Sequence, residues 1–162
     1  MSSPARIVRV VSGGQSGVDR AALETARMLG LPLGGWCPAG GWAEDLTEPP
    51  GVRALFPELA ETPSADPGQR TEWNVRDSDA TLVLTRGAVE SPGTAATVTF
   101  AQTLERPLLV VDVGVPELVE EWLRTLGRGL VLNVAGPRES EAPGIERDAL
   151  VTLLALADVF TG

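Results

Sequence analysis

Short apolar, β-branched runs alternate with segments of helical periodicity along most of this 162-residue chain. The runs that read as strands are continuously apolar rather than alternating, and they lie at 6–12, 31–36, 80–85, 107–113 and 130–134. Helices are expected at 17–30, 68–77, 93–105, 116–126 and 144–160. Continuous strands that alternate with helices are typical of a mostly parallel sheet with both faces covered. Right-handed crossovers then predict a single-domain, Rossmann-like, doubly wound α/β fold.

Residues 41–68 depart from this pattern, because they are rich in Pro, Gly and acidic residues. We expect an irregular insertion or flap there, with a short helical piece near Ala43 and a short strand at 59–62. The chain has no internal repeat and no low-complexity tail, and its length suits one domain with its own core. Residues 1–162 are therefore predicted to form one ligand-binding domain.

The chain contains no Lys, no His and no Tyr, and all 13 of its basic residues are Arg. This absence excludes Schiff-base lysine chemistry, a histidine general base, Ser-His-Asp and Cys-His triads, His-ligated zinc and a phosphate loop with lysine. Any bound anion must therefore be held by backbone amides, hydroxyl groups and Arg side chains.

With 22 acidic residues the formal net charge is −9, which disfavours nucleic acid and anionic membranes as partners. The N-terminal residues show no secretion signal, and no apolar run approaches the roughly 20 residues of a membrane span, so we expect a cytoplasmic protein. The single cysteine, Cys37, cannot form an internal disulfide. Its thiol is interpreted as a buried apolar group or, alternatively, as a partly exposed group that is redox-sensitive or binds a soft metal.

Ligands in a doubly wound sheet bind beyond the carboxyl ends of the strands, and three of the loops expected there are rich in Gly, hydroxyl groups and Arg. The first runs from Gly13 to Arg20, where glycines permit close backbone approach and the next helix presents free N–H groups. Ser16 is expected either to cap that helix or to donate to an anion. An ordinary strand-to-helix turn explains the same loop, which matches neither the G-x-G-x-x-G fingerprint nor a hydrolase elbow.

A second helix begins on the same edge at 92–94, and Thr97 lies one turn after Thr94. A ligand role for these threonines and a simple N-cap with a packed threonine both remain open. Arg138 suits bidentate contact to an oxyanion or a surface ion pair with a neighbouring Glu. Arg70 is expected to contact a ligand or another subunit, or to form a structural salt bridge.

Carboxylates are almost the only acid–base groups that remain to such a chain. If it is an enzyme, Asp19 or Glu72 is the expected acid or base, and otherwise no catalytic residue is predicted. No pair of acids has a spacing diagnostic of a metal site, so no metal ligands are predicted.

Five ordered motifs make the chain resemble the molybdenum cofactor carrier family over nearly its whole length. They lie at 13–20, 34–38, 70–75, 77–81 and 133–140. That family looks like a branch of a larger Rossmann-like superfamily, which also contains the lysine-decarboxylase-like phosphoribohydrolases. Those enzymes carry Pro-Gly-Gly-x-Gly-Thr followed by a catalytic Glu, whereas 92–97 reads Pro-Gly-Thr-Ala-Ala-Thr and no carboxylate follows at that place. Hydrolase activity of that type is therefore not expected.

The resemblance implies a homo-oligomer, a tetramer or a dimer, that binds molybdenum cofactor or a related nucleotide-like anion. Three functions stay open: a carrier or sensor for a phosphorylated small molecule, which we favour; a nucleotide-processing hydrolase or transferase with carboxylate chemistry; and a structural partner without a ligand. The predicted ligand-binding residues are Gly13, Gly14, Gln15, Ser16, Gly17, Arg20, Trp36, Arg70, Asn74, Gly93, Thr94, Thr97, Gly136, Arg138 and Ser140.

Overall fold

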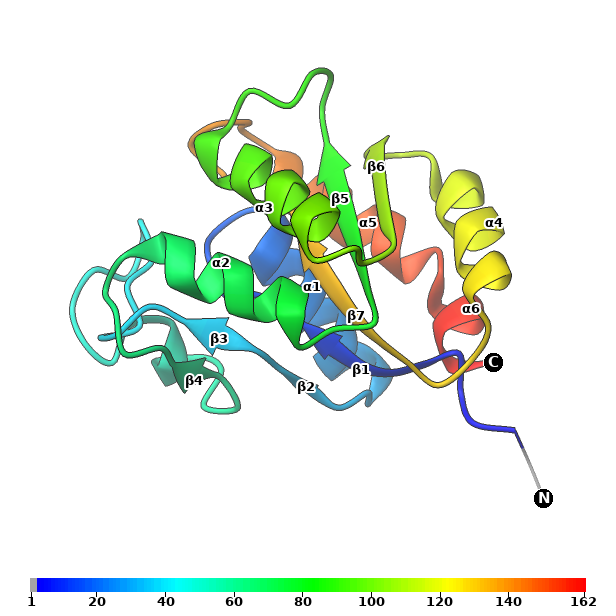
Figure 1. The fold of residues 1–162 in the computed structure, drawn as a ribbon, viewed down its shortest axis with the longest axis horizontal. Helices are drawn as coiled ribbons and strands as arrows, with labels where there is room; N and C mark the ends of the chain where they lie inside the picture. The colour runs from blue at the N-terminus through cyan, green and yellow to red at the C-terminus, as the bar shows by residue number, and fades with distance from the viewer. Residues whose placement is uncertain (1–2) are drawn as a thin grey trace.

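The computed structural model describes residues 3–162, which form a five-stranded parallel sheet with helices on both faces (Figure 1). In spatial order the strands are β2 (Leu33–Gly34), β1 (Ile7–Val11), β7 (Leu130–Ala135), β5 (Ala80–Thr85) and β6 (Leu108–Asp112). The helices are α1 (Val18–Leu29), α2 (Pro67–Arg76), α3 (Pro92–Thr103), α4 (Pro116–Leu126), α5 (Ile145–Leu154) and α6 (Ala157–Thr161). The predicted Rossmann-like α/β fold is confirmed.

The last strand in the sequence, β7, lies at the centre of the sheet, where it pairs with β1 on one side and β5 on the other. When the strands are numbered from β7 and continued through β1, their spatial order reads 3-2-1-4-5, as in a doubly wound sheet. The sheet is thus a permuted version of that order. The order reverses direction between β7 and β5, and ligands are expected beyond the carboxyl ends of the strands at such a switch point.

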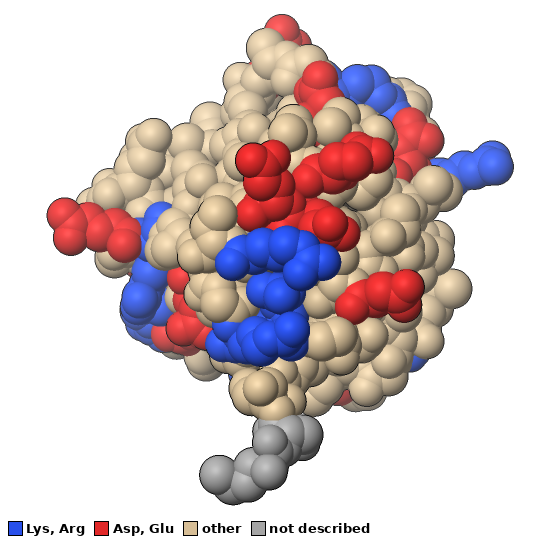
Figure 2. Space-filling view, turned by 90° about the vertical axis from the view of Figure 1, so that its right-hand side faces the viewer, with Lys and Arg blue, Asp and Glu red and all other residues tan. Residues whose placement is uncertain are grey.

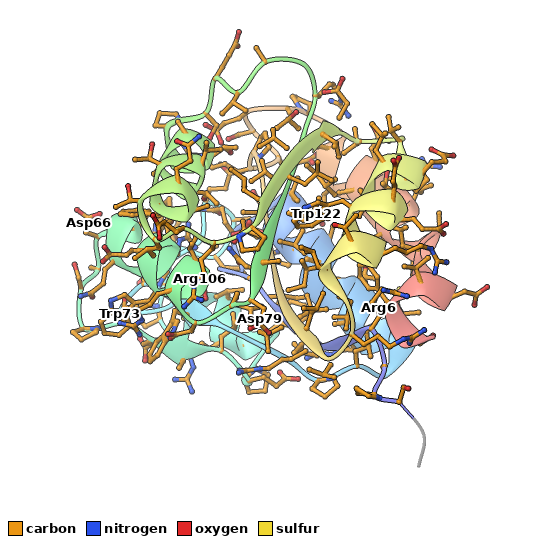
Figure 3. The ribbon with its side chains drawn as sticks, turned by 45° about the vertical axis from the view of Figure 1, so that its right-hand side comes forward. Arg6, Asp66, Trp73, Asp79, Arg106 and Trp122 are labelled. Atoms are coloured by element: carbon orange, nitrogen blue, oxygen red, sulfur yellow. The ribbon has the colours of Figure 1, made fainter. Side chains whose placement is uncertain are left out.

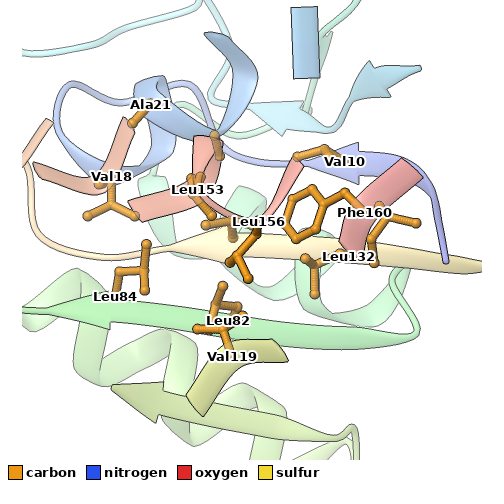
Figure 4. Close-up of a cluster of buried hydrophobic side chains, with 14 of the residues drawn as sticks. Val10, Val18, Ala21, Leu82, Leu84, Val119, Leu132, Leu153, Leu156 and Phe160 are labelled. Atoms are coloured by element: carbon orange, nitrogen blue, oxygen red, sulfur yellow. The ribbon is translucent and has the colours of Figure 1, made fainter. Parts of the chain in front are cut away.

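The main hydrophobic core lies on the face of the sheet that α1, α4, α5 and α6 cover (Figure 4). Leu82 and Leu132 of the central strands are fully buried against side chains such as Val18, Val119 and Leu153 from these helices. Burying each such leucine stabilises the fold by about 1.5–3 kcal/mol. On the opposite face α2 packs against α3, and both lie in front of the sheet in Figure 1.

The face of the sheet below α2 and α3 is partly polar. Thr81, Thr85 and Asn133 are buried there, and they alternate with the core leucines because successive strand residues point to opposite faces. Asn133 Nδ2 donates a hydrogen bond to Thr81 Oγ1 across the β5–β7 pair, at 3.3 Å. Strands that read as continuously apolar therefore carry polar groups toward one face, close to the switch point.

Two predicted elements are divided in the structure. The strand expected at 31–36 breaks at Gly35, whose φ is 124° and where a Cβ would lie 2.4 Å from the carbonyl oxygen of Ser12. Its second half, β3 (Trp36–Cys37), leaves the main sheet and pairs in parallel with β4 (Ala60–Glu61). The helix expected at 144–160 turns after α5, where the N–H group of Leu156 donates to Leu153, and this turn brings the side chain of Leu156 into the core.

The flap at 41–68 packs against α1 through a second buried cluster, which contains Leu23, Cys37, Val52, Phe56 and Leu59. The strand expected at 59–62 is present as β4. The helical piece is not near Ala43, as predicted, but is a 3-10 turn at Gly51–Ala54. Ala43 instead pairs with Leu46 in an isolated antiparallel bridge, because two backbone hydrogen bonds close a tight turn there.

Acidic and basic side chains lie side by side on the face that carries α4 and α6 (Figure 2). Burial lowers the pKa of the Arg6 guanidinium, and the nearby positive charges of Arg128 and Arg124 lower it further. Trp122 of α4 packs partly buried against the core, whereas Trp73 lies on α2 across the molecule (Figure 3). No helix in residues 3–162 has the length and apolar character needed to cross a membrane.

Candidate ligand-binding site

A cavity of about 290 Å³ lies at the carboxyl ends of β1, β7 and β5, at the switch point of the sheet. Its wall comes from the loop after β1, the first turn of α3, the end of β7 with the loop after it, and one side of α2. Because β7 lies between β1 and β5, the strand ends of β1 and β5 at this cavity are two strand spacings apart, roughly 10 Å. This size suits a small-molecule ligand.

The cavity brings together residues from both ends of the chain. The predicted ligand-binding residues that line it are Gly13, Gln15, Arg70, Asn74, Gly93, Thr94, Thr97, Gly136 and Arg138, and the candidate acid Asp19 lines it as well. Gly136 lets the loop after β7 cross over β5, because a Cβ there would lie 2.3 Å from the carbonyl oxygen of Leu84.

The N-terminus of α3 forms one end of the cavity. Ser91 caps the helix, and its Oγ accepts a hydrogen bond from the Thr94 N–H group at 3.4 Å. Pro92 at the first helical position has no N–H group, and within residues 3–162 the Gly93 N–H group has no acceptor. A helix N-terminus carries partial positive charge, so this end of the cavity favours an anion.

The Thr94 hydroxyl has no hydrogen-bond partner, and among residues 3–162 Thr94 Oγ1 is the one buried side-chain polar atom of which this is true. The residue is 2% exposed. An unpaired buried hydroxyl costs about 1–3 kcal/mol, which is why such groups are rare and usually point to a ligand or a water molecule. The hydroxyl of Thr97, one turn later, is already satisfied because it donates to the Gly93 carbonyl at 3.1 Å.

Asp19 lies at the other end of the cavity, below the loop after β1, and is 8% exposed. Burial raises the pKa of its carboxyl group to about 6. Arg70, the Gln15 and Gly13 N–H groups and Arg20 oppose that shift without cancelling it. Arg70 Nη1 lies 4.0 Å from Asp19 Oδ2 and donates to the Gly13 carbonyl at 2.9 Å, so Arg70 combines a cavity position with a structural contact.

Two asparagines line the cavity with different amounts of freedom. The Asn74 side chain is committed to the backbone of Trp36, where its Oδ1 accepts from the N–H group at 2.8 Å and its Nδ2 donates to the carbonyl at 3.0 Å. Asn133, at the centre of the cavity floor, uses Nδ2 for its contact with Thr81. Its Oδ1 accepts no hydrogen bond in residues 3–162 and, unlike Thr94 Oγ1, is not fully enclosed, so it is available to a ligand.

Arg138 lies at the mouth of the cavity, with its side chain 41% exposed. Its Nε is 3.4 Å from Glu141 Oε1 and 3.7 Å from Glu44 Oε2. Glu141 Oε1 also accepts from Ser91 Oγ at 3.0 Å and from the Arg138 N–H group at 3.1 Å. A carboxylate of the chain itself therefore holds the donors that surround the start of α3.

Several predicted residues lie outside this cavity, namely Gly14, Ser16, Gly17, Arg20, Trp36, Ser140 and the candidate acid Glu72. Ser16 Oγ and Ser140 Oγ each donate to Glu44 of the flap at 2.5 Å. Despite the opposing effect of burial, hydrogen bonds from Ser140 and Ser16 hold the pKa of Glu44 below its usual value.

The start of α1 is likewise occupied by the protein itself. The Gly17 N–H group donates to Glu146 Oε1 at 2.9 Å. Arg20 forms two hydrogen bonds of 2.9 Å with Asp45 of the flap and donates to the Gly14 carbonyl. The groups that were expected to bind an anion at the start of α1 thus form hydrogen bonds with α5 and with the flap.

Some residues that line the cavity were not predicted from the sequence, namely Trp42, Pro67, Thr71, Ser91, Pro92, Asn133, Ala135 and Glu141. Ser91 has a sequence signal, because Ser before Pro-Gly-Thr is a typical N-cap. Asn133 has another, since an amide within an otherwise apolar strand requires a partner. Trp42 and Glu141 reach the cavity through long-range packing of the flap and of the loop after β7, which no local pattern indicates.

Cys37 is fully buried beside Leu23 and Phe56, and its thiol lies outside the cavity. Burial raises the pKa of the thiol, which disfavours a reactive thiolate. Among residues 3–162 no cluster of three or more Cys, Asp or Glu side chains is arranged to hold a metal ion.

Comparisons with known proteins show what this chain is similar to. The crystal structure of a "Putative molybdenum carrier protein" from Syntrophus aciditrophicus has a TM-score of 0.83 and 35% sequence identity, over 99% of this chain and 98% of that one. The E-1-hydroxy-2-methyl-but-2-enyl-4-diphosphate reductase of Plasmodium falciparum has a TM-score of 0.41 and 11% identity, over 96% of this chain and 55% of that one, a likeness too weak to bear on the fold. A search of curated proteins found no match.

The family model cpYpsA, described as the circularly permutated YpsA SLOG family, matches residues 10–157. The permuted strand order, with the last strand at the centre of the sheet, agrees with that description. This chain belongs to the circularly permutated YpsA SLOG family.

Proposed function

We propose that this protein is a carrier that binds molybdenum cofactor, or a related phosphorylated nucleotide-like ligand, in the cavity at the ends of β1, β7 and β5. The observation that carries the proposal is the unpaired, buried hydroxyl of Thr94 beside the free Gly93 N–H group at the start of α3. Both groups suit the oxygen atoms of a phosphate. The likeness to a structure described as a "Putative molybdenum carrier protein" supports a cargo related to molybdenum.

The shape of the cavity favours an organic ligand over a single oxyanion. The cavity lies across the ends of three strands, of which the outer two are roughly 10 Å apart, so a molybdate or phosphate ion at α3 would leave the β1 end empty. Away from α3 the wall offers polar groups of a different kind, a carboxylate from Asp19 at the β1 end and a carbonyl oxygen from Asn133 on the central strand β7. A ligand with a phosphate at one end and a polar ring at the other would use both.

The charges of the wall balance, because Arg70 and Arg138 face Asp19 and Glu141. Glu141 holds Ser91 Oγ and the Arg138 guanidinium, which are donors that a phosphate would also use. We therefore expect a bound phosphate to replace Glu141 at these donors. This exchange keeps the number of charge-assisted hydrogen bonds nearly constant and lets the cargo be released again.

The test measures the binding of molybdenum cofactor, GMP, inorganic phosphate and molybdate by calorimetry, and their effect on the melting temperature of the protein. We expect saturable binding and thermal stabilisation by the cofactor and by GMP, and much weaker binding of the two small oxyanions. Arg138→Ala should weaken GMP binding about tenfold, since a charge-assisted contact is lost. Arg124→Ala removes the same charge from α4, away from the cavity, and should change nothing. A melting temperature that stays constant with every compound would contradict the proposal.

A second candidate function is turnover of a nucleotide-like substrate. The observation that favours it is the pKa of about 6 at Asp19, which suits a general acid or base inside a ligand cavity. Glu72, the other candidate, lies outside the cavity. If the protein forms product from a nucleoside monophosphate and Asp19→Asn abolishes this activity, an enzyme is favoured. If a chromatographic screen detects no product, the carrier is favoured.

We expect the protein to act as a homo-oligomer, which light scattering coupled to size-exclusion chromatography measures directly. A mass of 17.0 kDa in that experiment would contradict this expectation.

A further inference from the structure

The Asp19 carboxylate lies beside Arg70 at the β1 end of the cavity, the end opposite to the start of α3. It comes from the first turn of α1 and lies beneath the loop after β1, with only 8% of the residue exposed. Binding of a phosphate at the start of α3 does not require a buried acid at this end. Burying a carboxylate is costly unless hydrogen-bond donors surround it, so the donors near Asp19 show how many hydrogen bonds it could still accept.

The donors that the protein itself offers to Asp19 do not saturate it. A carboxylate has about four acceptor positions. The N–H groups of Gln15 and Gly13 approach it, and Arg70 Nη1 is 4.0 Å from Oδ2 while it donates to the Gly13 carbonyl. These two N–H groups leave acceptor capacity for a ligand in the cavity that Asp19 lines.

We propose that Asp19 recognises a ring edge that carries adjacent N–H and NH₂ donors, so that the ligand is a phosphate monoester of a 2-amino-4-oxo-pyrimidine-type heterocycle such as a guanine or a pterin. This inference rests on the proposed function and names the substrate class of the same cavity. Two parallel N–H···O bonds match the two oxygens of a carboxylate. The cavity lies across the ends of β1 and β5, which are roughly 10 Å apart, and this span fits a ligand whose phosphate lies at α3 and whose ring lies at Asp19.

The flap adds a flat apolar surface to this end of the site. Trp42 lines the cavity and is 37% exposed, so its indole is available to the face of a ring. Stacking on an aromatic side chain tolerates any planar ring, whereas the contact with Asp19 distinguishes ring edges. The two contacts together select a heterocycle that is planar and also rich in N–H groups.

The ionisation of Asp19 gives the recognition a pH dependence. Arg70 on α2, Arg20 on α1 and the N–H groups of Gln15 and Gly13 face the carboxyl group and favour its charged form, and burial favours the neutral form. With a pKa of about 6, Asp19 accepts two hydrogen bonds at pH 7.5 and becomes protonated below pH 6. Affinity for an amino-bearing ring should therefore fall as the pH drops through about 6.

The experiment compares GMP with IMP, which has the same phosphate, sugar and ring but lacks the 2-amino group. By calorimetry at pH 7.5 the wild-type protein is expected to bind GMP about 10- to 100-fold more tightly than IMP, the usual effect of one hydrogen bond to a charged group. Asp19→Asn should reduce this preference to less than threefold. Glu24→Gln removes a carboxylate from the same helix outside the cavity and should keep the wild-type preference.

The wild-type comparison alone can overturn the proposal, so the test does not depend on whether Asp19→Asn folds. Equal affinity for GMP and IMP overturns it, and so does a preference that stays constant between pH 7.5 and pH 5. If molybdenum cofactor binds and GMP and IMP are not distinguished, the proposed function stands and this inference fails. If neither nucleotide nor the cofactor binds, both fail.

Discussion

Replacing Thr94 by Val tests whether the unpaired hydroxyl in the cavity wall is a ligand contact. The substitution exchanges Oγ1 for a methyl group of similar size on a residue that is 2% exposed. A buried hydroxyl without a partner costs about 1–3 kcal/mol, so the free variant should gain about 1 kcal/mol or more of unfolding free energy. For a chain of this length each kcal/mol moves Tm by roughly 2–4 °C, and differential scanning calorimetry without ligand should show a rise of at least about 2 °C.

The same variant should bind its ligand less tightly. A hydrogen bond from a neutral hydroxyl to a charged phosphate contributes about 1.5–3 kcal/mol, so GMP affinity measured by calorimetry should fall about 10- to 100-fold. Stability and affinity thus change in opposite directions. A simple packing defect would lower both, because it damages the free protein and the site together.

Thr97→Val is the matched control. Its hydroxyl already donates to the Gly93 carbonyl, so removing it deletes a satisfied hydrogen bond and should not raise the melting temperature. A Thr94→Val protein that melts below the wild type, or that binds GMP with wild-type affinity, would refute the assignment of this hydroxyl.

Three further predictions concern the remaining groups of the cavity. Glu141→Gln should tighten binding of inorganic phosphate roughly tenfold in calorimetry, because it removes a carboxylate from beside Ser91 and Arg138, and weaker binding would contradict this. The pKa of Asp19 is higher in the folded than in the unfolded protein, so the folded protein binds the proton more tightly. The free energy of unfolding should therefore fall by about 3 kcal/mol as the pH rises from about 4 to above 6. Asp19→Asn should remove that fall in denaturant titrations, and an unchanged pH profile would count against it. Gly136→Ala should cost about 1–3 kcal/mol, since its Cβ would meet Leu84 O at 2.3 Å, whereas Gly93→Ala, with Ser91 Oγ at 4.0 Å, should leave the melting temperature unchanged.

Local sequence patterns were sufficient to predict the α/β class and most elements of the fold. The runs at 80–85 and 107–113 and the helices at 93–105 and 116–126 reappear with small shifts at their ends as β5, β6, α3 and α4. These elements are determined by periodicity and by Pro and Gly at their ends. The position of β7 between β1 and β5 depends on long-range strand pairing, which no local pattern encodes.

The same distinction holds for the candidate site. The loop after β1 and the start of α3 were both predicted as anion-binding helix ends, because each has glycines and hydroxyl groups. Both contribute to the cavity wall, but the start of α3 keeps the Gly93 N–H group and the Thr94 hydroxyl without a partner there. At the first, Glu44 and Glu146 reach in from distant segments and take the Ser16 hydroxyl and the Gly17 N–H group. A sequence shows which donors exist, whereas the fold decides which acceptors reach them.

The most direct test of the central claim is a crystal structure of the protein with GMP. We expect phosphate oxygens within hydrogen-bond distance of the Gly93 N–H group and the Thr94 hydroxyl, with the guanine edge on Asp19. A phosphate at Gly14–Gly17, at the start of α1, with the cavity between β1 and β5 unoccupied, would contradict it.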